Sequence, residues 1–124
     1  LDVRIRYTTN GSPPSLTNGL NYTGPLTINK TAVIRAAGFK PGHYPSEIRT
    51  YTYIFPADVI RQSPTGTAPP GWPSTWGANT VDYGMDPNVV NNQAYGSTIQ
   101  GDLQAIPTYS IVTDLKNLLR HYKA

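Results

Sequence analysis

The first 55 residues alternate apolar and polar side chains in short runs, and Gly or Pro interrupts the chain between runs. A period of two is typical of strands, because successive side chains of a strand point to opposite faces. Asn10-Gly11 and Lys40-Pro41-Gly42 supply turns, since Gly accepts positive φ and Pro lacks the donor that a sheet ladder needs. The runs cover residues 3–8, 20–28, 31–39 and 46–55. They predict four or five antiparallel strands, which form a small β-sandwich or part of one.

The first run has an apolar side and a polar side. Val3, Ile5 and Tyr7 share one parity, whereas Arg4, Arg6 and Thr8 share the other. We expect the apolar side to face a core and the arginines to face solvent. Residues 31–39 carry apolar side chains on both parities, so we expect that strand to be buried on much of both faces.

The chain changes character after Pro56. Residues 63–77 are rich in Pro, Gly, Thr and Ser and contain Trp72 and Trp76. Two tryptophans in a free linker would expose a large apolar area, so we expect an extended segment that lies on a surface. The sequence thus predicts two parts, a β-rich module over residues 1–55 and a wrapping segment with short C-terminal helices over residues 56–124.

The helical signals all lie in the second part. Asp86-Pro87 offers an N-cap followed by proline at the first helical position, which predicts a short turn of helix through residue 90. Ser97 or Thr98 can cap a helix whose apolar stripe is spaced by three and four residues and which Pro107 ends. Residues 108–112 are a strand candidate, and residues 114–122 predict a terminal helix.

Composition excludes several classes of protein. Charged residues make up 14% of the chain, against about 25% in an average soluble domain, yet nine Tyr, two Trp and two Phe supply aromatic mass, so a disordered tail is excluded. There is no Cys, which excludes disulfides, thiolate metal sites and thiol catalysis. The net charge of +3 is scattered, so we expect no nucleic-acid partner. No apolar run approaches the roughly 20 residues of a membrane span, so we expect no membrane insertion.

The start of the sequence bears on its origin. It begins at Leu1 without an initiator Met or a signal peptide, and its first residues already have the pattern of a strand. We therefore expect a processed or excised piece of a longer protein.

Several motifs in the first part occur in the order of a known family. They are Ile5 to Pro13 with the sequence Ile-Arg-Tyr-Thr-Thr-Asn-Gly-Ser-Pro, then Tyr22-Thr23-Gly24-Pro25-Leu26, Val33-Ile34-Arg35-Ala36, and residues 46–53. Together they resemble the immunoglobulin-like, fibronectin type III associated domain found at the C-terminus of chitobiase and β-hexosaminidases, over residues 1–55. The resemblance implies a mainly β, Ig-like antiparallel sandwich, followed here by an irregular segment with two or three short helices.

The sequence departs from that family at its start. Members have one or two strands before the Ile-Arg-Tyr-Thr motif, whereas only four residues precede Ile5 here. We therefore expect a sandwich that lacks an edge strand and leaves a row of backbone groups to be paired or covered. Residues 56–124, another chain or a missing part of this chain would supply the cover.

The second part resembles a different context. Asp58 to Gln62, Asp82 to Pro87, and Ile106 to Val112 are similar to the segment that precedes CotH-like kinase domains in large secreted bacterial proteins, over residues 56–112. The chain has no Gly-rich phosphate loop and no paired lysine and acidic metal ligands. The resemblance therefore implies a neighbourhood and no kinase activity.

Catalytic constellations are missing from the sequence. Asp82 and Asp86 are four residues apart and could share a hard cation, but capping is the favoured role, especially for Asp86. His43 and His121 have no partners at ligand spacing, and we expect turn or surface roles. No Gly-x-Ser-x-Gly elbow is present. We expect no enzyme activity, no metal and no cofactor.

Aromatic residues in the irregular segment are candidate glycan-binding residues. Sugar-binding modules stack exposed rings on the apolar face of a pyranose, and Trp72, Trp76, Tyr83 and Tyr95 are placed in sequence for such a role. The favoured alternative is that the tryptophans cover the open side of the sandwich. Asn21 and Asn29 stand in glycosylation sequons, and the Asn10 sequon is followed directly by Pro13, which impairs acceptors.

These patterns predict a secreted, non-catalytic structural or adhesion module at the cell surface. Its partners would be other subunits or neighbouring domains of a larger chain, and an open sheet edge would allow filament assembly by β-strand addition. The alternatives are a carbohydrate-binding accessory module of a secreted glycoside hydrolase, with polysaccharide as partner, and a fragment of a CotH-like kinase-containing surface protein.

Overall fold

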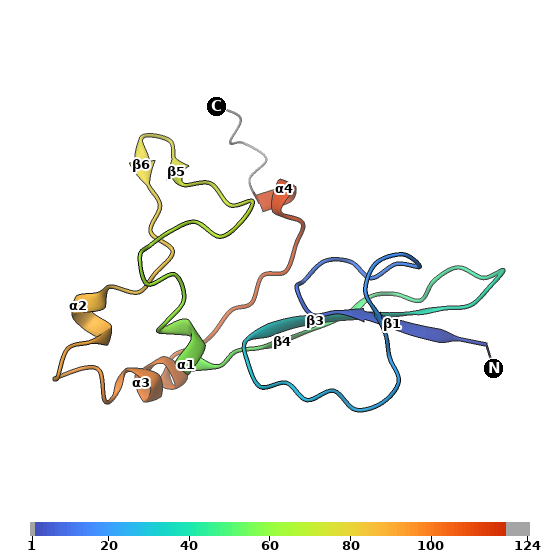
Figure 1. Ribbon diagram of the computed structural model, residues 1–124, viewed down its shortest axis with the longest axis horizontal. Coiled ribbons are helices and arrows are strands. Elements are labelled where there is room, and N and C mark those ends of the chain that lie inside the picture. Colours follow the sequence, from blue (N-terminus) through green and yellow to red (C-terminus); the bar gives the residue numbers. More distant parts are fainter. Residues whose placement is uncertain (1, 119–124) are drawn as a thin grey trace. The chain divides into compact units, whose positions relative to one another are not determined.

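The structure, a computed structural model, describes residues 2–118 and divides them into two compact units (Figure 1). The first unit contains the residues up to Ile54 together with Ser110–Asp114. The second contains Phe55–Tyr109 together with a short helix at 115–118. Each unit is described separately below.

The first unit is built on one antiparallel sheet. Its strands are β1 (Arg4–Thr8), β2 (Leu20–Asn21), β3 (Ala32–Phe39) and β4 (Arg49–Tyr53). They lie in the order β2-β1-β3-β4, and every neighbouring pair is antiparallel. The predicted mainly β, antiparallel fold class is confirmed, and the sheet is consistent with an Ig-like sandwich. The expected open edge does not lie at β1, because β1 is inside the sheet and the edges are β2 and β4.

The register divides the strand residues between two faces. Ile5, Tyr7, Leu20, Ile34, Tyr51 and Tyr53 share one face, here called the open face. Arg6, Thr8, Val33, Arg35, Ala37 and Phe39 share the other, here called the covered face. Three of the covered-face side chains are buried, namely Thr8, Ala37 and Phe39, whereas Ile34 is the buried member of the open face.

The loop at residues 9–19 explains this choice of face. The Thr8 hydroxyl donates to the carbonyl of Ser12 at 2.6 Å, and the Arg35 guanidinium donates to the carbonyl of Gly11 at 3.1 Å. The Arg6 guanidinium donates to the carbonyls of Asn18 and Gly19. Backbone carbonyls therefore draw the polar side chains of β1 and β3 beneath the loop.

The expected orientation of β1 was therefore wrong. Val3 and Ile5 are about half exposed, while Thr8 on the opposite parity is only 5% exposed and Arg6 is half-buried. The alternation of β1 identifies two faces but not which of them the following loop will cover. The runs at residues 20–28 and 46–55 form shorter strands than expected. Strand β2 has two residues and β4 has five.

The second unit is held together mainly by turns and short helices. Its elements are α1 (Pro56–Val59), β5 (Thr75–Trp76), β6 (Asn79–Thr80), α2 (Pro87–Val90), α3 (Ile99–Ala105) and α4 (Leu115–Leu118). Strands β5 and β6 form a hairpin, and α1 packs against α3. Ile99 is the one hydrophobic side chain that is buried among the described residues of this unit.

The predicted helices that begin at Pro87 and Ile99 are confirmed, but α3 ends at Ala105, so Ile106, expected on its apolar face, lies beyond the helix and is 59% exposed. The Asp86 carboxylate caps α2 by accepting a hydrogen bond from the Asn88 amide at 2.8 Å. Thr98 is the N-cap residue of α3, although its hydroxyl donates instead to the carbonyl of Tyr95. The terminal helix is present as α4, and the remainder of its expected range, residues 119–122, lies outside the described residues.

The predicted strand at residues 108–112 is wrong. This stretch has no assigned secondary structure, and Tyr109 and Ile111 are 88% and 81% exposed. Its alternating residues have the composition of a strand, but a strand also requires a neighbouring backbone to pair with. Among residues 2–118, no helix is long and apolar enough to cross a membrane.

Candidate functional site

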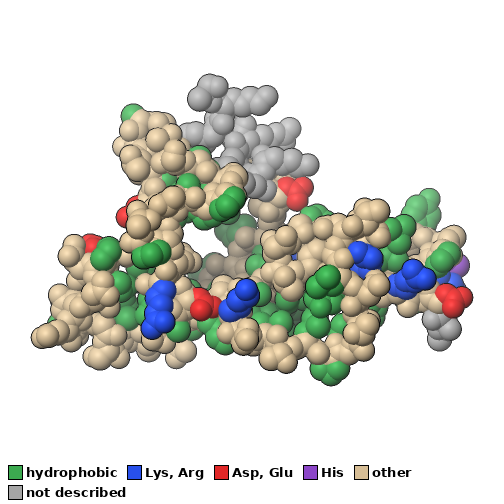
Figure 2. Space-filling view, in the orientation of Figure 1, with side chains coloured by type: hydrophobic (Ala, Val, Ile, Leu, Met, Phe, Trp, Pro, Cys, Tyr) green, Lys and Arg blue, Asp and Glu red, His purple; other side chains and the backbone are tan. Residues whose placement is uncertain are grey.

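The open face exposes more apolar area than a strand face inside a core would. Ile5, Leu20, Tyr51 and Tyr53 are 44%, 59%, 58% and 44% exposed. Figure 2 shows hydrophobic side chains at the surface over the sheet, interspersed with polar atoms and with Lys or Arg side chains. Isolated exposed apolar residues are ordinary, but a group on one face of one sheet marks a candidate contact surface.

The edge at β4 is the longer of the two sheet edges. Strand β4 and its two flanking residues have the sequence Ile-Arg-Thr-Tyr-Thr-Tyr-Ile over residues 48–54. One side of β4 is paired with β3, and no backbone hydrogen bond to its other side is found in the described part of the chain. The edge carries one charged side chain, Arg49, and no Pro, so it has few of the features that block pairing.

Ser110 contacts β4 on the covered face of the sheet and does not add a strand to the edge. The hydroxyls of Thr52 and Ser110 lie 2.6 Å apart, and Thr52 shares the face of Val33. Ser110 thus contacts the sheet through a side chain. Arg49 forms an ion pair with Glu47 at 3.7 Å, in which both side chains are largely exposed. Such a pair contributes little stability and leaves Arg49 able to take another partner.

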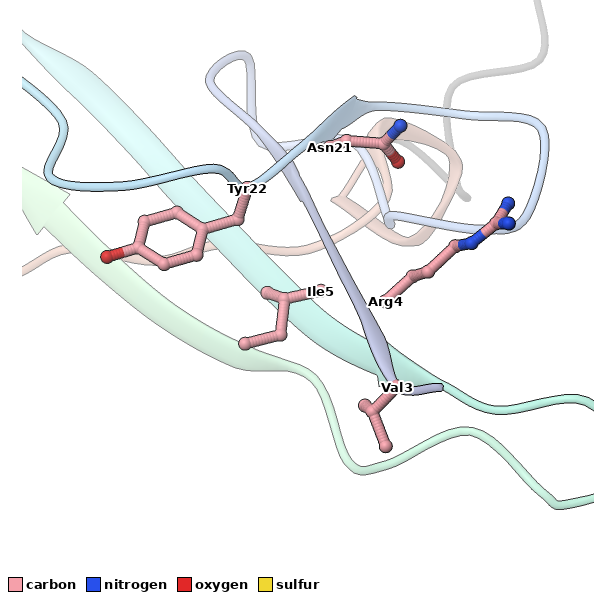
Figure 3. A pocket seen from close by; sticks show the side chains of 5 residues that line it. All are labelled: Val3, Arg4, Ile5, Asn21 and Tyr22. Carbon is pink, nitrogen blue, oxygen red and sulfur yellow. The ribbon is translucent and has the colours of Figure 1, made fainter. Parts of the chain in front are cut away.

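The opposite edge is short and contains a cavity of about 280 Å³. It is lined by Val3, Arg4, Ile5, Asn21 and Tyr22 (Figure 3). In this view Val3, Ile5 and Tyr22 point to one side and Arg4 and Asn21 to the other, as strand alternation requires. The Tyr22 amide donates to the carbonyl of Ile5 at 2.8 Å, which extends the pairing of β1 by one bond beyond β2.

A second cavity, of about 360 Å³, lies in the second unit. Its lining residues are Gln62, Ser63, Pro69, Trp72 and Tyr83. The rings of Trp72 and Tyr83 meet edge to face, with centroids 5.9 Å apart and planes at 78°. The cavity therefore has two aromatic walls and no charged side chain among its lining residues.

Hydrogen bonds fix the walls of this aromatic pocket. The Tyr83 hydroxyl donates to the carbonyl of Pro73 at 2.8 Å, and the Gln62 side-chain amide donates to the carbonyl of Tyr83 at 3.4 Å. The Trp72 backbone amide donates to the carbonyl of Pro69 at 3.0 Å. Trp72 is 41% exposed, so part of its ring surface is open to solvent.

The other two aromatic candidates are not among the lining residues of this pocket. Trp76 lies in β5 and is 45% exposed, and Tyr95 follows α2 and is 55% exposed. The structure thus brings together two of the four candidate glycan-binding residues. Gln62, Ser63 and Pro69 complete the pocket, and no sequence signal identified them, because their approach to Trp72 depends on the turns at Gly66 and Gly71, which have positive φ.

The sequon asparagines lie at the surface of the first unit. Asn21 is in β2, where its side-chain oxygen accepts a hydrogen bond from Arg6 at 3.3 Å. Asn29 is exposed in the connection between β2 and β3. The Asn10 side-chain oxygen accepts hydrogen bonds from the amide and hydroxyl of Ser12, so this triplet is folded into a turn.

The acidic and histidine side chains have local roles where the structure describes them. Asp82 accepts a hydrogen bond from the Gly84 amide at 2.9 Å, and Asp86 caps α2. His43 is exposed, with its Nδ1 atom 3.1 Å from the carbonyl of Pro41, and His121 lies outside the described residues. Within residues 2–118, no group of three or more potential metal ligands is found. The arrangement suits binding through strand edges and aromatic surfaces.

Comparison with known proteins assigns the first part of the chain. The model of the family described as Fn3 associated matches residues 1–53, which contain all four strands of the sheet. Comparison with curated proteins and with solved structures gave no match. The match ends before α1, so the resemblance of residues 56–112 to the segment that precedes CotH-like kinase domains stays a prediction.

The family match also defines the coarse character of the module. Fn3-associated domains are accessory, non-catalytic modules of larger proteins and occur in secreted proteins. The predicted resemblance of the first part is confirmed. Residues 1–53 of this chain are therefore similar to the Fn3-associated family over the whole of the four-stranded sheet.

Proposed function

We propose that this chain is a non-catalytic extracellular module with a structural or adhesive role, joined to other polypeptides by β-strand addition at β4. The observation that carries the proposal is the unpaired edge at residues 48–54, which offers β-branched and aromatic side chains and a single charge. An extended segment added to such an edge gains main-chain hydrogen bonds, and its side chains meet those of the edge strand. Its partners are other subunits or neighbouring domains of a larger secreted chain.

The exposed open face supports the same role. A strand added beside β4 would place alternate side chains next to Tyr51 and Tyr53, which are both about half exposed. Cross-strand pairs with aromatic residues stabilise a sheet by roughly 0.2–1 kcal/mol each. Strand addition would therefore reduce the solvent exposure of the open face and would also provide hydrogen-bond partners for the backbone groups of the β4 edge.

Hydrogen exchange tests this function directly. A synthetic peptide of alternating Thr and Val, with a Lys at each end for solubility, serves as a generic strand. We expect it to slow exchange of the outward-facing amides of β4 and to leave the amides of the second unit unchanged. Tyr51→Lys should weaken this protection, because a charge at an edge strand opposes pairing.

The matched control is Tyr44→Lys, which makes the same change at a side chain that is 99% exposed and lies outside the strands. It should leave the protection at the level of the unmodified chain. Protection that is absent at every peptide concentration, or that is equally reduced by both variants, would refute strand addition at β4.

A second candidate function is binding of a neutral sugar in the aromatic pocket. The pocket favours it because the ring planes of Trp72 and Tyr83 form two walls at 78° and no charged side chain is among the lining residues. Its volume of about 360 Å³ lies near the lower end of the range for small-molecule sites, roughly 300–1,000 Å³. That size suits a terminal sugar rather than an internal stretch of a polysaccharide.

Calorimetric titration with neutral oligosaccharides, including chitin and cellulose fragments, tests this candidate. Trp72→Ala should abolish any binding, and Trp76→Ala is the matched control because Trp76 is similarly exposed and is not among the pocket residues. Equal loss of binding in both variants would place the sugar elsewhere. The absence of heat across the panel would remove this candidate.

A further inference from the structure

Residues 48–54 read almost the same in both directions. The sequence is Ile-Arg-Thr-Tyr-Thr-Tyr-Ile, so Ile48 mirrors Ile54, Thr50 mirrors Thr52, and Tyr51 is the centre. Only Arg49 and Tyr53 differ across this centre. Because antiparallel strands run in opposite directions, a strand with this symmetry is complementary to a second copy of itself.

We propose that β4 pairs antiparallel with β4 of a second copy of this chain, about a two-fold axis at Tyr51. The proposal rests on the proposed function, since it names the polypeptide that is added at the β4 edge. The two four-stranded sheets then form one continuous sheet, and the interface is isologous because both copies use the same residues.

The pairing places suitable side chains opposite one another on both faces. On the open face Tyr51 meets its symmetry mate, and Arg49 of each copy lies opposite Tyr53 of the other. A guanidinium over an aromatic ring is a favourable cation–π pair. On the covered face Thr50 lies opposite Thr52, and threonine pairs are common in antiparallel sheets. No two charges of the same sign are directly opposed within residues 48–54.

Other registers are less complementary. A shift by one residue would place open-face side chains opposite covered-face side chains, which the pleat of a sheet does not allow. Centring the pair on Thr50 would set Ile48 opposite Thr52 and Arg49 opposite Tyr51, and would leave Tyr53 beyond the strand. Only the register centred on Tyr51 pairs the two flanking isoleucines and keeps all five residues of β4 in the ladder.

The other sheet edge does not offer the same interface. Strand β2 has two residues, which is too short for a specific ladder, and Arg6 is engaged with Asn21 and with the loop that precedes it. A single β4–β4 contact closes on itself and gives a dimer rather than a fibre. Strand β4 contributes five residues from each copy, fewer than the roughly 20–30 residues per side of a standard interface, so we expect a weak dimer that strengthens when the module is repeated in a larger assembly.

Exchanging the arginine and tyrosine positions of β4 tests the register while a large side chain stays at each position. In Tyr53→Arg, each Arg49 faces an arginine of the other copy, and sedimentation velocity should show the dimer lost. The double variant Arg49→Tyr with Tyr53→Arg restores a tyrosine opposite each arginine, and the dimer should return. Ala36 and Ala32 are the β3 neighbours of these two positions, so the swap has little effect on contacts within one chain.

Disulfide trapping gives a second, independent measurement. The chain has no Cys, so each introduced thiol is unique. A mixture of Thr50→Cys and Thr52→Cys chains should form the cross-linked heterodimer at least about tenfold faster than Tyr44→Cys chains cross-link, because pairing raises the effective concentration of the two thiols. The variants with one thiol at 50 or at 52 alone should cross-link less than their mixture.

The outcomes separate this proposal from the proposed function. A monomer at all concentrations, together with cross-linking no faster than for Tyr44→Cys, would overturn the dimer. If the generic strand peptide still protects β4 in that case, strand addition stands and the partner is a different polypeptide. If double-swap chains fail to recover the dimer that Tyr53→Arg removes, the register centred on Tyr51 is wrong.

Discussion

The two units are of similar length but are ordered by different interactions. In the first, backbone ladders between four strands and the carbonyls of one loop fix the chain, and Ile34, Ala37 and Phe39 are buried. In the second, most of the order comes from turns, short helices and caps, and Ile99 is the buried hydrophobic side chain. The difference shows that similar Gly and Pro content can punctuate a sheet in one half and shape an irregular segment in the other.

The largest expected effect is on the core of the first unit. Phe39→Ala should lower the free energy of unfolding of the sheet by about 3–4 kcal/mol, because the ring is 7% exposed and its removal leaves a cavity. Urea unfolding followed by far-ultraviolet circular dichroism measures this change. Tyr44→Ala removes an aromatic ring that is 99% exposed and should change stability by less than about 0.5 kcal/mol.

Both tryptophans lie in the second unit, so their fluorescence distinguishes the units. In Phe39→Ala the midpoint of the fluorescence transition should stay close to that of the unmodified chain. A shift as large as that of the circular dichroism signal would show that the two units unfold together, and would contradict the division drawn from their contacts.

Ile99→Ala is the corresponding test of the second unit. We expect a loss of about 2–3 kcal/mol in the tryptophan fluorescence transition, since Ile99 is 7% exposed at the start of α3. Ile106→Ala, at a side chain that is 59% exposed, is the control and should have a small effect. Equal effects of the two variants would mean that burial of Ile99 does not order this unit.

Gly19→Ala tests the loop that covers the sheet. Gly19 has φ +100°, and an added Cβ would lie 2.5 Å from the carbonyl oxygen of Tyr7. We expect a loss of about 2 kcal/mol from backbone strain and the clash. Gly24→Ala is the control, because no atom lies within 4 Å of its added Cβ and its φ is not in the left-handed region. A Gly19→Ala variant as stable as Gly24→Ala would contradict the described loop.

The smallest expected effect is at the cap of α2. Asp86→Ala should cost about 1 kcal/mol of local stability, because the Asn88 amide loses its acceptor. Faster hydrogen exchange of the Asn88 amide measures the loss. Asp86→Asn keeps a side-chain oxygen at the cap and should exchange nearly as slowly as the unmodified chain. Rapid exchange in both variants would mean that the carboxylate charge, rather than the hydrogen bond, stabilises the turn.

Local patterns predicted those features that local interactions decide. The apolar residues of β3 lie on both of its faces, so they indicated a strand whichever face of the sheet is covered. Asp86-Pro87 indicated the start of α2. The burial of Thr8 could not be predicted, because it depends on a carbonyl contributed by Ser12 after the chain has turned. Residues 108–112 failed as a strand for a related reason, since a strand requires a partner that its own sequence does not specify.

The candidate sites show the same limit. Trp72 and Tyr83 could be identified as exposed aromatic candidates, but their separation from Trp76 and Tyr95 depends on several turns in between. The symmetry of residues 48–54 was visible in the sequence, yet it had no meaning until the topology placed β4 at an edge. A pattern becomes a candidate interface only when the fold leaves it unpaired.

The arginine that holds the loop over the sheet has a consequence for which side chains this position can accept. Arg6 donates to the neutral carbonyls of Asn18 and Gly19 and to the Asn21 side chain. A lysine would keep the positive charge on a single ammonium group, but it lacks the planar fork that lets a guanidinium donate to several acceptors at once. The loop is therefore held by the shape of the Arg6 guanidinium as well as by its charge, and Arg6→Lys would keep the charge but lose part of this hydrogen bonding.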